Sequence, residues 1–108
     1  MGADVKFVVY NQSERDWRVH AVPVSSGSYK VPLHPDWCGL EEDELAQVSG
    51  FFDATFCHAR GVVGGAQTYE TAVKMAECTL AAAANVHPAS TIIEPHKNGR
   101  VSILYLLL

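Results

Sequence analysis

The fold of this chain is decided by the stretch FCHARGVVGGAQT, residues 56–68, together with the helical pattern that follows it. Strand-forming residues flank a tight turn here, with Thr55–His58 on one side and Val62-Val63 on the other. Arg60-Gly61 lies between them, and its glycine can take the positive φ that a short hairpin turn requires. The stretch therefore predicts a β-hairpin.

A glycine pair, Gly64-Gly65, follows the hairpin directly. Glycine lets a backbone bend sharply, or lets a neighbour approach it closely. We expect this pair to form the turn that leads into a helix. Thr68 is a favourable N-cap for that helix, because its hydroxyl can accept a hydrogen bond from an amide of the first helical turn.

Residues 68–84 carry the clearest helical pattern of the chain. Apolar side chains recur at helical spacing and form one face, while Glu70 and Lys74 sit off that face. Asn85 and Pro88 predict the end of the helix. The predicted apolar face consists of Tyr69, Ala72, Val73, Ala76, Leu80, Ala83 and Ala84.

Two runs near the N-terminus predict a second hairpin. Val5–Tyr10 is rich in strand formers, and Trp17–Val22 alternates apolar and polar residues after a polar, turn-like connection. Arg18 and His20 then project from one face of the hairpin. That face is either solvated or, if it borders the glycine pair, supplies ligands for an anion.

Shorter signals complete the predicted fold. Glu41–Ser49 predicts a short helix, with Leu45 and Val48 facing inward and a glycine at its end. Val101–Leu108 is almost wholly apolar and predicts a strand at a sheet edge, or a surface that packs on a partner. We expect one α+β domain over residues 1–108: a small, mainly antiparallel sheet from two hairpins, with the long helix packed on a face and one short helix.

Composition places the chain among globular proteins. Of its 108 residues, 48% are hydrophobic and 19% are charged, and the formal net charge is −4. This charge argues against a free-standing nucleic-acid binder, which would normally present a basic face, but it permits a local phosphate pocket. No apolar run reaches the ~18 residues that span a membrane, so we expect no membrane partner.

The chain has three cysteines and five histidines. The odd number of cysteines favours reduced thiols and an intracellular setting, whether nuclear, mitochondrial or cytoplasmic. None of the spacings CxxC, HxH or HExxH occurs, so we expect no metal site. Cys57 and His58 are a poor nucleophile–base pair, because adjacent residues of a strand point to opposite faces.

The glycine pair and the helix start also have a chemical interpretation. Amides of a first helical turn point outward at the positive end of the dipole, so an anion can dock there without a charged side chain. His58 lies just upstream and could add a donor. The alternative is that Gly64 and Gly65 only turn the chain.

A set of short motifs occurs in order along residues 17–84. They are Trp17-Arg18-Val19-His20-Ala21-Val22-Pro23, Pro32-Leu33, Trp37-x-Gly39-Leu40, Glu44-Leu45, Ser49-Gly50 and Phe56-x-His58-x-x-Gly61-x-x-Gly64-Gly65-x-x-Thr68-x-Glu70-x-Ala72-x-x-Met75-Ala76. In this order and spacing the chain resembles the C-terminal part of the Myg-type (melanocyte proliferating gene) family of RNA exonucleases, which is related to DHH-type phosphoesterases. His20, Cys38 and Val62 depart from the family's usual Gln, Arg and Phe, and residues 1–16 and 85–108 match less well.

The resemblance implies a role in substrate binding. In DHH-type enzymes the C-terminal domain covers the catalytic domain and holds the substrate, often through a glycine-rich motif. By this analogy Gly64, Gly65 and the amides near Thr68 would hold a phosphate or nucleotide, and Arg18 and His58 would assist. The family's catalytic half, whose clustered His and Asp residues bind divalent metal, has no counterpart in these residues. We therefore expect no catalytic residue, no cofactor and no hydrolysis from this chain alone.

Two functions stay open on the sequence. One is a non-catalytic substrate-binding or capping module of a nuclease, with a nucleotide or RNA phosphate as ligand and a catalytic domain or subunit as partner. The other is a structural or protein-interaction domain without a ligand site, which forms a homo-oligomer through residues 101–108 or an exposed sheet edge. Anion binding around residues 64–68 would separate the two.

Overall fold

The computed structural model describes residues 5–23, 31–84, 91–95 and 101–106, and for residue 84 and the last two ranges it describes the backbone alone. Both predicted helices are present, and the first strand runs to Ser13 rather than ending at Tyr10. The elements in chain order are β1 (Val5–Ser13), β2 (Asp16–Ala21), a 3₁₀ turn (Pro35–Trp37), α1 (Glu42–Ser49), β3 (Ala54–Cys57), β4 (Val63–Ala66), α2 (Tyr69–Ala84), β5 (Thr91–Pro95) and β6 (Val101–Leu106).

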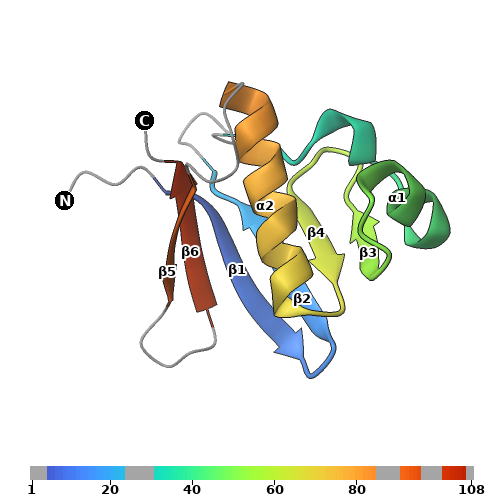
Figure 1. Ribbon diagram of the computed structural model, residues 1–108, viewed down its shortest axis with the longest axis horizontal. Helices are drawn as coiled ribbons and strands as arrows, with labels where there is room; N and C mark the ends of the chain where they lie inside the picture. The colour runs from blue at the N-terminus through green and yellow to red at the C-terminus, as the bar shows by residue number, and fades with distance from the viewer. Residues whose placement is uncertain (1–4, 24–30, 85–90, 96–100, 107–108) are drawn as a thin grey trace.

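One six-stranded sheet organises these elements, in the order β3-β4-β2-β1-β6-β5. Each neighbouring pair of strands is antiparallel. β1–β2 and β3–β4 are the two predicted hairpins, and the pairing of β2 with β4 joins them. α2 lies across one face of the sheet (Figure 1), which confirms the predicted α+β fold.

The C-terminal tail forms a strand, as predicted, but not the sheet edge. β6 pairs with β1 on one side and with β5 on the other, where Thr91 lies opposite Leu106. The sequence of β5 is weakly patterned, and so it predicted no strand to cover β6. Residues 107–108 lie outside the described residues.

The hydrophobic core lies between the sheet and α2. Alternation along β2 buries Val19 and Ala21 on the helix side and turns Arg18 and His20 to the opposite face, as predicted. Such alternation is typical of an antiparallel sheet that is packed on one side only. The sheet contributes Phe7, Val9, Val19, Ala21, Ala54, Cys57 and Ala66 to the core.

α2 supplies the other half of the core, and its buried hydrophobic side chains are Ala72, Val73, Met75, Ala76, Leu80 and Ala81. Ala83, which the helical spacing predicts on the same face, is exposed. The reason is that the last turn of α2 extends past the ends of β2 and β4 (Figure 1). Within the described part of the chain, neither helix has the length and apolar character needed to cross a membrane.

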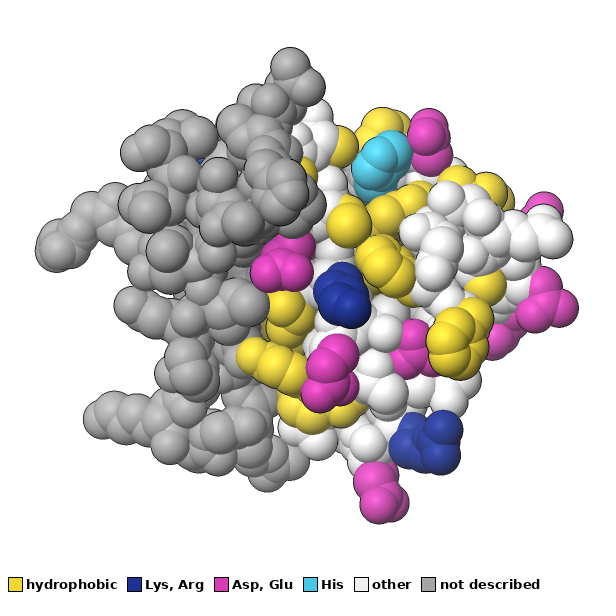
Figure 2. Space-filling view, viewed as in Figure 1, with side chains coloured by type: hydrophobic (Ala, Val, Ile, Leu, Met, Phe, Trp, Pro, Cys, Tyr) yellow, Lys and Arg dark blue, Asp and Glu magenta, His cyan; other side chains and the backbone are white. Residues whose placement is uncertain are grey.

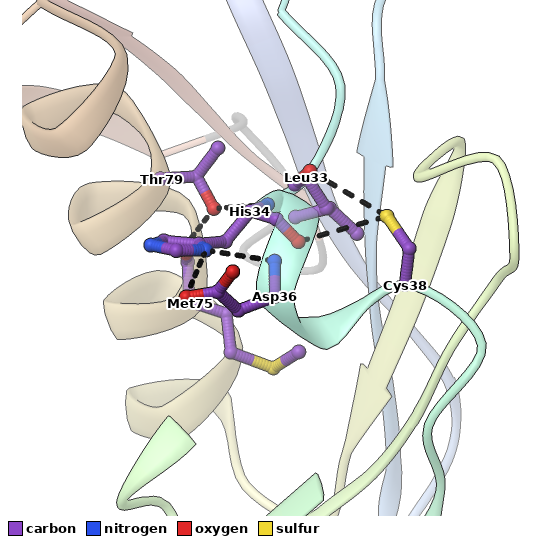
Figure 3. A network of polar contacts seen from close by, with 6 residues as sticks. All are labelled: Leu33, His34, Asp36, Cys38, Met75 and Thr79. Atoms are coloured by element: carbon purple, nitrogen blue, oxygen red, sulfur yellow. Dashed lines mark hydrogen bonds and ion pairs between the residues drawn. The ribbon is translucent and has the colours of Figure 1, made fainter. Parts of the chain in front are cut away.

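The loop of residues 31–40 is tied to both the sheet and α2. Leu33 is buried, and its amide donates to the carbonyl oxygen of Gly61 at 2.9 Å. The His34 amide donates to Thr79 Oγ1 at 3.2 Å, and this hydroxyl donates to the Met75 carbonyl oxygen at 2.8 Å (Figure 3). These bonds hold the loop against the middle of α2.

α1 is short and packs through one side only. Leu45 is buried, as predicted, and Gly50 ends the helix with a φ of 83°. The prediction that Val48 faces inward is wrong, because this side chain is 51% exposed. α1 contacts β3 and the 3₁₀ turn, and these contacts do not cover Val48.

The prediction of a glycine turn is also wrong. Gly64 and Gly65 both lie inside β4, paired with β2 on one side and β3 on the other. A Cβ on Gly65 would lie 2.5 Å from Phe56 Cε1, and a Cβ on Gly64 would lie 3.0 Å from Leu33 Cδ1. The glycines therefore permit close packing on both faces of the strand, and residues 67 and 68 make the turn into α2.

Candidate functional site

A hollow of about 340 Å³ opens at the end of the sheet where α2 begins. It is formed by three connections that are distant in sequence: the β1–β2 turn, the α1–β3 connection and the start of α2. Ala66 pairs with Trp17 on one side and with Ala54 on the other. The residues that precede Trp17 and Ala54 and those that follow Ala66 therefore lie close together. The lining residues are Arg15, Phe52, Asp53, Gln67, Thr68 and Thr71.

Asp53 caps the start of α2 from outside the helix. Thr68 Oγ1 donates to one carboxylate oxygen of Asp53 at 2.7 Å, and Thr71 Oγ1 donates to the other at 2.5 Å. The Thr71 amide donates to Thr68 Oγ1 at 3.3 Å, which confirms Thr68 as the N-cap. The carboxylate thus lies beside the first turn of α2, where the positive end of the helix dipole favours a negative charge.

Arg15 supplies the positive charge of the hollow. Its Nη2 donates to Gln67 Oε1 at 2.9 Å, which uses one of the five N–H groups of an arginine. The Arg15 side chain is exposed, and so is Phe52 at the rim. The hollow therefore combines a cation, a carboxylate, two hydroxyls and an aromatic ring.

Arg18, a predicted phosphate ligand, lies on the face of the sheet opposite α2. Its Nε and Nη2 donate to the two carboxylate oxygens of Asp16 at 2.9 Å and 3.0 Å. Its guanidinium also lies 5.1 Å from the centre of the Phe56 ring. The hydrogen bond from Arg18 lowers the pKa of Asp16, and the same bond raises the pKa of Arg18. Arg18 thus already has an anionic partner within the fold.

The five predicted ligand residues do not converge on one site. Arg18 and Gly65 are cross-strand partners, whereas Gly64 faces Leu33 and Met75 on the other side of the sheet. His58 is exposed in the β3–β4 turn, where its Nδ1 accepts from the Arg60 amide at 3.0 Å. The length of β4, roughly 13 Å at ~3.3 Å per residue, separates His58 from Thr68. Of the five, Thr68 alone lines the hollow.

Arg15, Phe52 and Asp53 line the hollow but were not predicted from the sequence as site residues. Their convergence depends on the pairing of Ala66 with two strands, and no local pattern encodes that pairing. One signal in the sequence was usable. Polar residues precede β2 and β3 and follow β4, and these three positions lie at the same end of the sheet.

The cysteines have the features of structural thiols. Cys38, Cys57 and Cys78 are all unpaired, and Cys57 is buried. Burial raises the pKa of Cys57 to about 12, with a further contribution from Cys38 beside it. A thiol with so high a pKa is almost wholly protonated at neutral pH and is a poor nucleophile.

Metal ligation finds no support in the described residues. Across residues 5–23 and 31–83, no three His, Cys, Asp or Glu side chains are grouped so that they could hold an ion.

Charge on the α2 face is mixed. Figure 2 shows that Lys and Arg side chains are sparse on this face and that Asp and Glu side chains lie among them. With a formal net charge of −4 for the chain, the described part of this face offers no broad basic area. A nucleic acid would have to be held by local contacts there rather than by a long-range field.

Comparison with known proteins identifies relatives of this chain. The MYG1 exonuclease family model, described as "Uncharacterised protein family (UPF0160)", matches residues 1–80. MYG1 exonuclease of Rattus norvegicus is 42% identical over 79 residues, which cover 71% of this chain and 21% of the rat protein. MYG1 exonuclease of Homo sapiens is 42% identical over 77 residues, covering 69% of this chain and 20% of the human protein. MYG1 protein of Dictyostelium discoideum is 40% identical over 78 residues, covering 70% of this chain and 24% of the Dictyostelium protein.

The matched segment includes the whole hollow. Residues 1–80 run from before β1 into the last part of α2, and every lining residue lies within them. The chain spans between a fifth and a quarter of the length of these curated relatives. No solved structure matches it. The extent of the family match shows that this chain belongs to the MYG1 exonuclease family.

Proposed function

We propose that this chain is a non-catalytic substrate-binding or capping module of a nuclease-related protein, and that it binds a phosphate or nucleotide in the hollow at the start of α2. One observation carries the proposal: residues 1–80, which the family model matches, form a hollow that is lined by a cation, a carboxylate and hydroxyls. Relatives named exonucleases are about five times as long as the matched segment, which leaves ample chain for a separate catalytic part.

The hollow favours one orientation of a phosphorylated ligand. Asp53 carries a negative charge at the start of α2, so a phosphate is repelled from the first-turn amides. Arg15 lies on the other side of Gln67 and presents N–H donors that match phosphate oxygens. The ligand therefore places its phosphate on Arg15 and directs hydroxyl groups toward Asp53.

This assignment changes the roles proposed for the predicted residues. Thr68 orients Asp53 and lines the site. Gly64 and Gly65 act indirectly, because they let β4 pack closely enough to position the start of α2. Arg18 and His58 lie away from the hollow and take no part in it.

The proposal includes a partner and a cellular setting. A catalytic domain or subunit would supply the divalent metal and the hydrolytic residues, and this chain would contribute no cofactor. The unpaired thiols are consistent with a reducing, intracellular compartment.

A second function, a protein-interaction domain without a ligand, is favoured by one observation. Val48 and Phe52 are large apolar side chains with 51% and 92% exposure, and they lie on α1 and the connection that follows it. An exposed apolar pair of this kind is suited to a protein contact.

An NMR titration separates the two functions. Inorganic phosphate, adenosine monophosphate and a short oligoadenylate are added to the labelled chain at low salt. The substrate-binding function predicts saturable shifts at the amides of Arg15, Gln67 and Thr68, which weaken in Arg15→Gln. The matched control is Arg60→Gln, since Arg60 is exposed in the turn at the far end of β4. Absence of shifts, with lines that broaden as protein concentration rises, would favour the interaction domain.

A further inference from the structure

Phe52 is an aromatic side chain that the fold holds out into solvent. It is 92% exposed, whereas the neighbouring Phe51 packs against Trp37 with ring centres 6.1 Å apart and planes at 76°. Phe51 therefore supplies the apolar contact that anchors this turn to the rest of the fold. Phe52 contributes almost no buried surface to the fold, so its ring is available for another contact.

The backbone around Phe52 is fixed by hydrogen bonds on both sides. The Phe51 amide donates to Ser49 Oγ at 3.1 Å, and the Ala54 amide donates to the Phe51 carbonyl oxygen at 3.0 Å. The Gln67 amide donates to the Asp53 carbonyl oxygen, also at 3.0 Å. Because this turn is already ordered, a ligand that covers the Phe52 ring loses little entropy in fixing it.

Two charged groups of opposite sign line the same small hollow as this ring. Arg15 is a cation, and Asp53 is a carboxylate that accepts from two threonine hydroxyls. A carboxylate has about four lone-pair sites, so Asp53 can accept from ligand hydroxyls as well. The volume of about 340 Å³ is within the range of small-ligand sites.

We propose that Phe52 is a stacking platform for an unpaired nucleobase, with the phosphate of that nucleotide on Arg15 and a sugar hydroxyl donating to Asp53; this rests on the substrate-binding function proposed above. A nucleotide carries three matching groups at short spacing: an aromatic base for Phe52, sugar hydroxyls for Asp53 and a phosphate for Arg15. The phosphate is placed on Arg15 rather than on the first-turn amides of α2, because the Asp53 carboxylate beside that turn repels an anion. The other side chains that line the hollow are polar or charged, so they match the phosphate and hydroxyl groups of a nucleotide better than the apolar core of a protein interface.

The stacking contact requires an unpaired base, whatever its identity. Each base has a π-face, so an aromatic platform binds unpaired nucleotides with little preference for sequence. Base–aromatic stacking is lost when the ring is truncated to alanine, and this loss corresponds to a decrease in affinity of roughly 5- to 150-fold per base. A paired base in a duplex cannot reach the ring.

The test measures binding of a fluorescently labelled oligoadenylate to the full 108-residue chain by anisotropy at low salt. Phe52→Ala is expected to weaken binding by roughly 5- to 150-fold. Phe52→Trp is expected to keep the affinity, and its added tryptophan fluorescence is expected to fall as the oligomer binds. Val48→Ala is the matched control, because Val48 is a second exposed large apolar side chain among the described residues and lies outside the hollow. An abasic oligomer of the same length is expected to bind equally weakly to the wild type and to Phe52→Ala.

The outcomes distinguish this inference from the function on which it rests. If Arg15→Gln weakens binding and Phe52→Ala does not, the stacking platform is wrong while the substrate-binding function stands. If the wild type binds neither the oligomer nor phosphate, both fail. If Phe52→Ala abolishes self-association in sedimentation velocity and leaves oligomer binding unchanged, Phe52 belongs to a protein interface. Circular dichroism checks that each variant is folded, which the exposure of Phe52 leads us to expect.

Discussion

Thr68 Oγ1 donates a hydrogen bond of 2.7 Å to the carboxylate of Asp53, fifteen positions earlier in the chain. The same hydroxyl accepts from the Thr71 amide, so one side chain joins the end of the α1–β3 connection to the first turn of α2. This pair fixes the wall of the hollow and, at the same time, the starting point of the main helix of the core.

Replacing Thr68 by Val tests this link. Valine keeps the shape of the side chain but removes the hydroxyl, so the helix loses its N-cap and Asp53 loses a donor. We expect a decrease of about 1–2 kcal/mol in the free energy of unfolding, measured by urea denaturation. Thr68→Ser keeps the hydroxyl and is expected to stay within about 0.5 kcal/mol of wild type. Equal losses in the two variants would show that the hydroxyl is not the cause.

Asp16 and Arg18 predict a small dependence of stability on acid pH. Hydrogen bonding to Arg18 lowers the pKa of Asp16 in the folded state. The pair therefore stabilises the fold above the unfolded-state pKa of about 3.9, and this stabilisation is lost as the pH falls through the lower, folded-state pKa. Because both side chains are partly exposed, we expect no more than about 1 kcal/mol.

The measurement compares wild type with Asp16→Asn in urea at a series of pH values. The difference in unfolding free energy is expected at neutral pH and is expected to vanish at the acid end. A difference that persists unchanged to the lowest pH would contradict an origin in the charge of Asp16.

Gly65→Ala tests the close approach of β3 and β4. A Cβ at this position would lie 2.5 Å from Phe56 Cε1 and 2.7 Å from Thr55 Oγ1, so the Phe56 ring must move. We expect a loss of about 1–3 kcal/mol in unfolding free energy, which is typical of overpacking. The double variant with Phe56→Ala removes the ring contact and leaves the contact with Thr55, so the cost of Gly65→Ala is expected to shrink without vanishing. Strict additivity of the two substitutions would rule out this contact as the reason.

Ala76→Glu tests the buried face of α2. Ala76 is fully buried between the helix and the sheet, so a carboxylate there loses its hydration without a partner. We expect a loss of about 3 kcal/mol or more and a markedly lower melting midpoint. Ala83→Glu, seven residues further along the same helix, is the control, because Ala83 is exposed and should tolerate the change. An unchanged midpoint for Ala76→Glu would contradict the packing of α2.

Local sequence was sufficient for the elements whose causes are local. The 3.6-residue periodicity of residues 69–84, the positive φ of 72° at Gly61 and of 83° at Gly50, and the alternation of Trp17–Ala21 depend only on near neighbours in the chain. These features predicted both hairpins, both helices and the α+β class. Thr68 was predictable as a cap for the same reason.

Tertiary structure decided what depends on contacts between distant segments. The sequence of Gly64 and Gly65 is equally compatible with a turn. In the fold both are strand residues, and rings and methyl groups pack against β4 too closely to leave room for a Cβ. Val48 and Ala83 obey helical spacing but are exposed, since exposure depends on where the neighbouring strands end. The hollow exists because Ala66 pairs with two strands and so brings Arg15, Phe52 and Asp53 together. A sequence encodes each strand's preference by itself, but the choice of partner strands follows from the burial of the whole core.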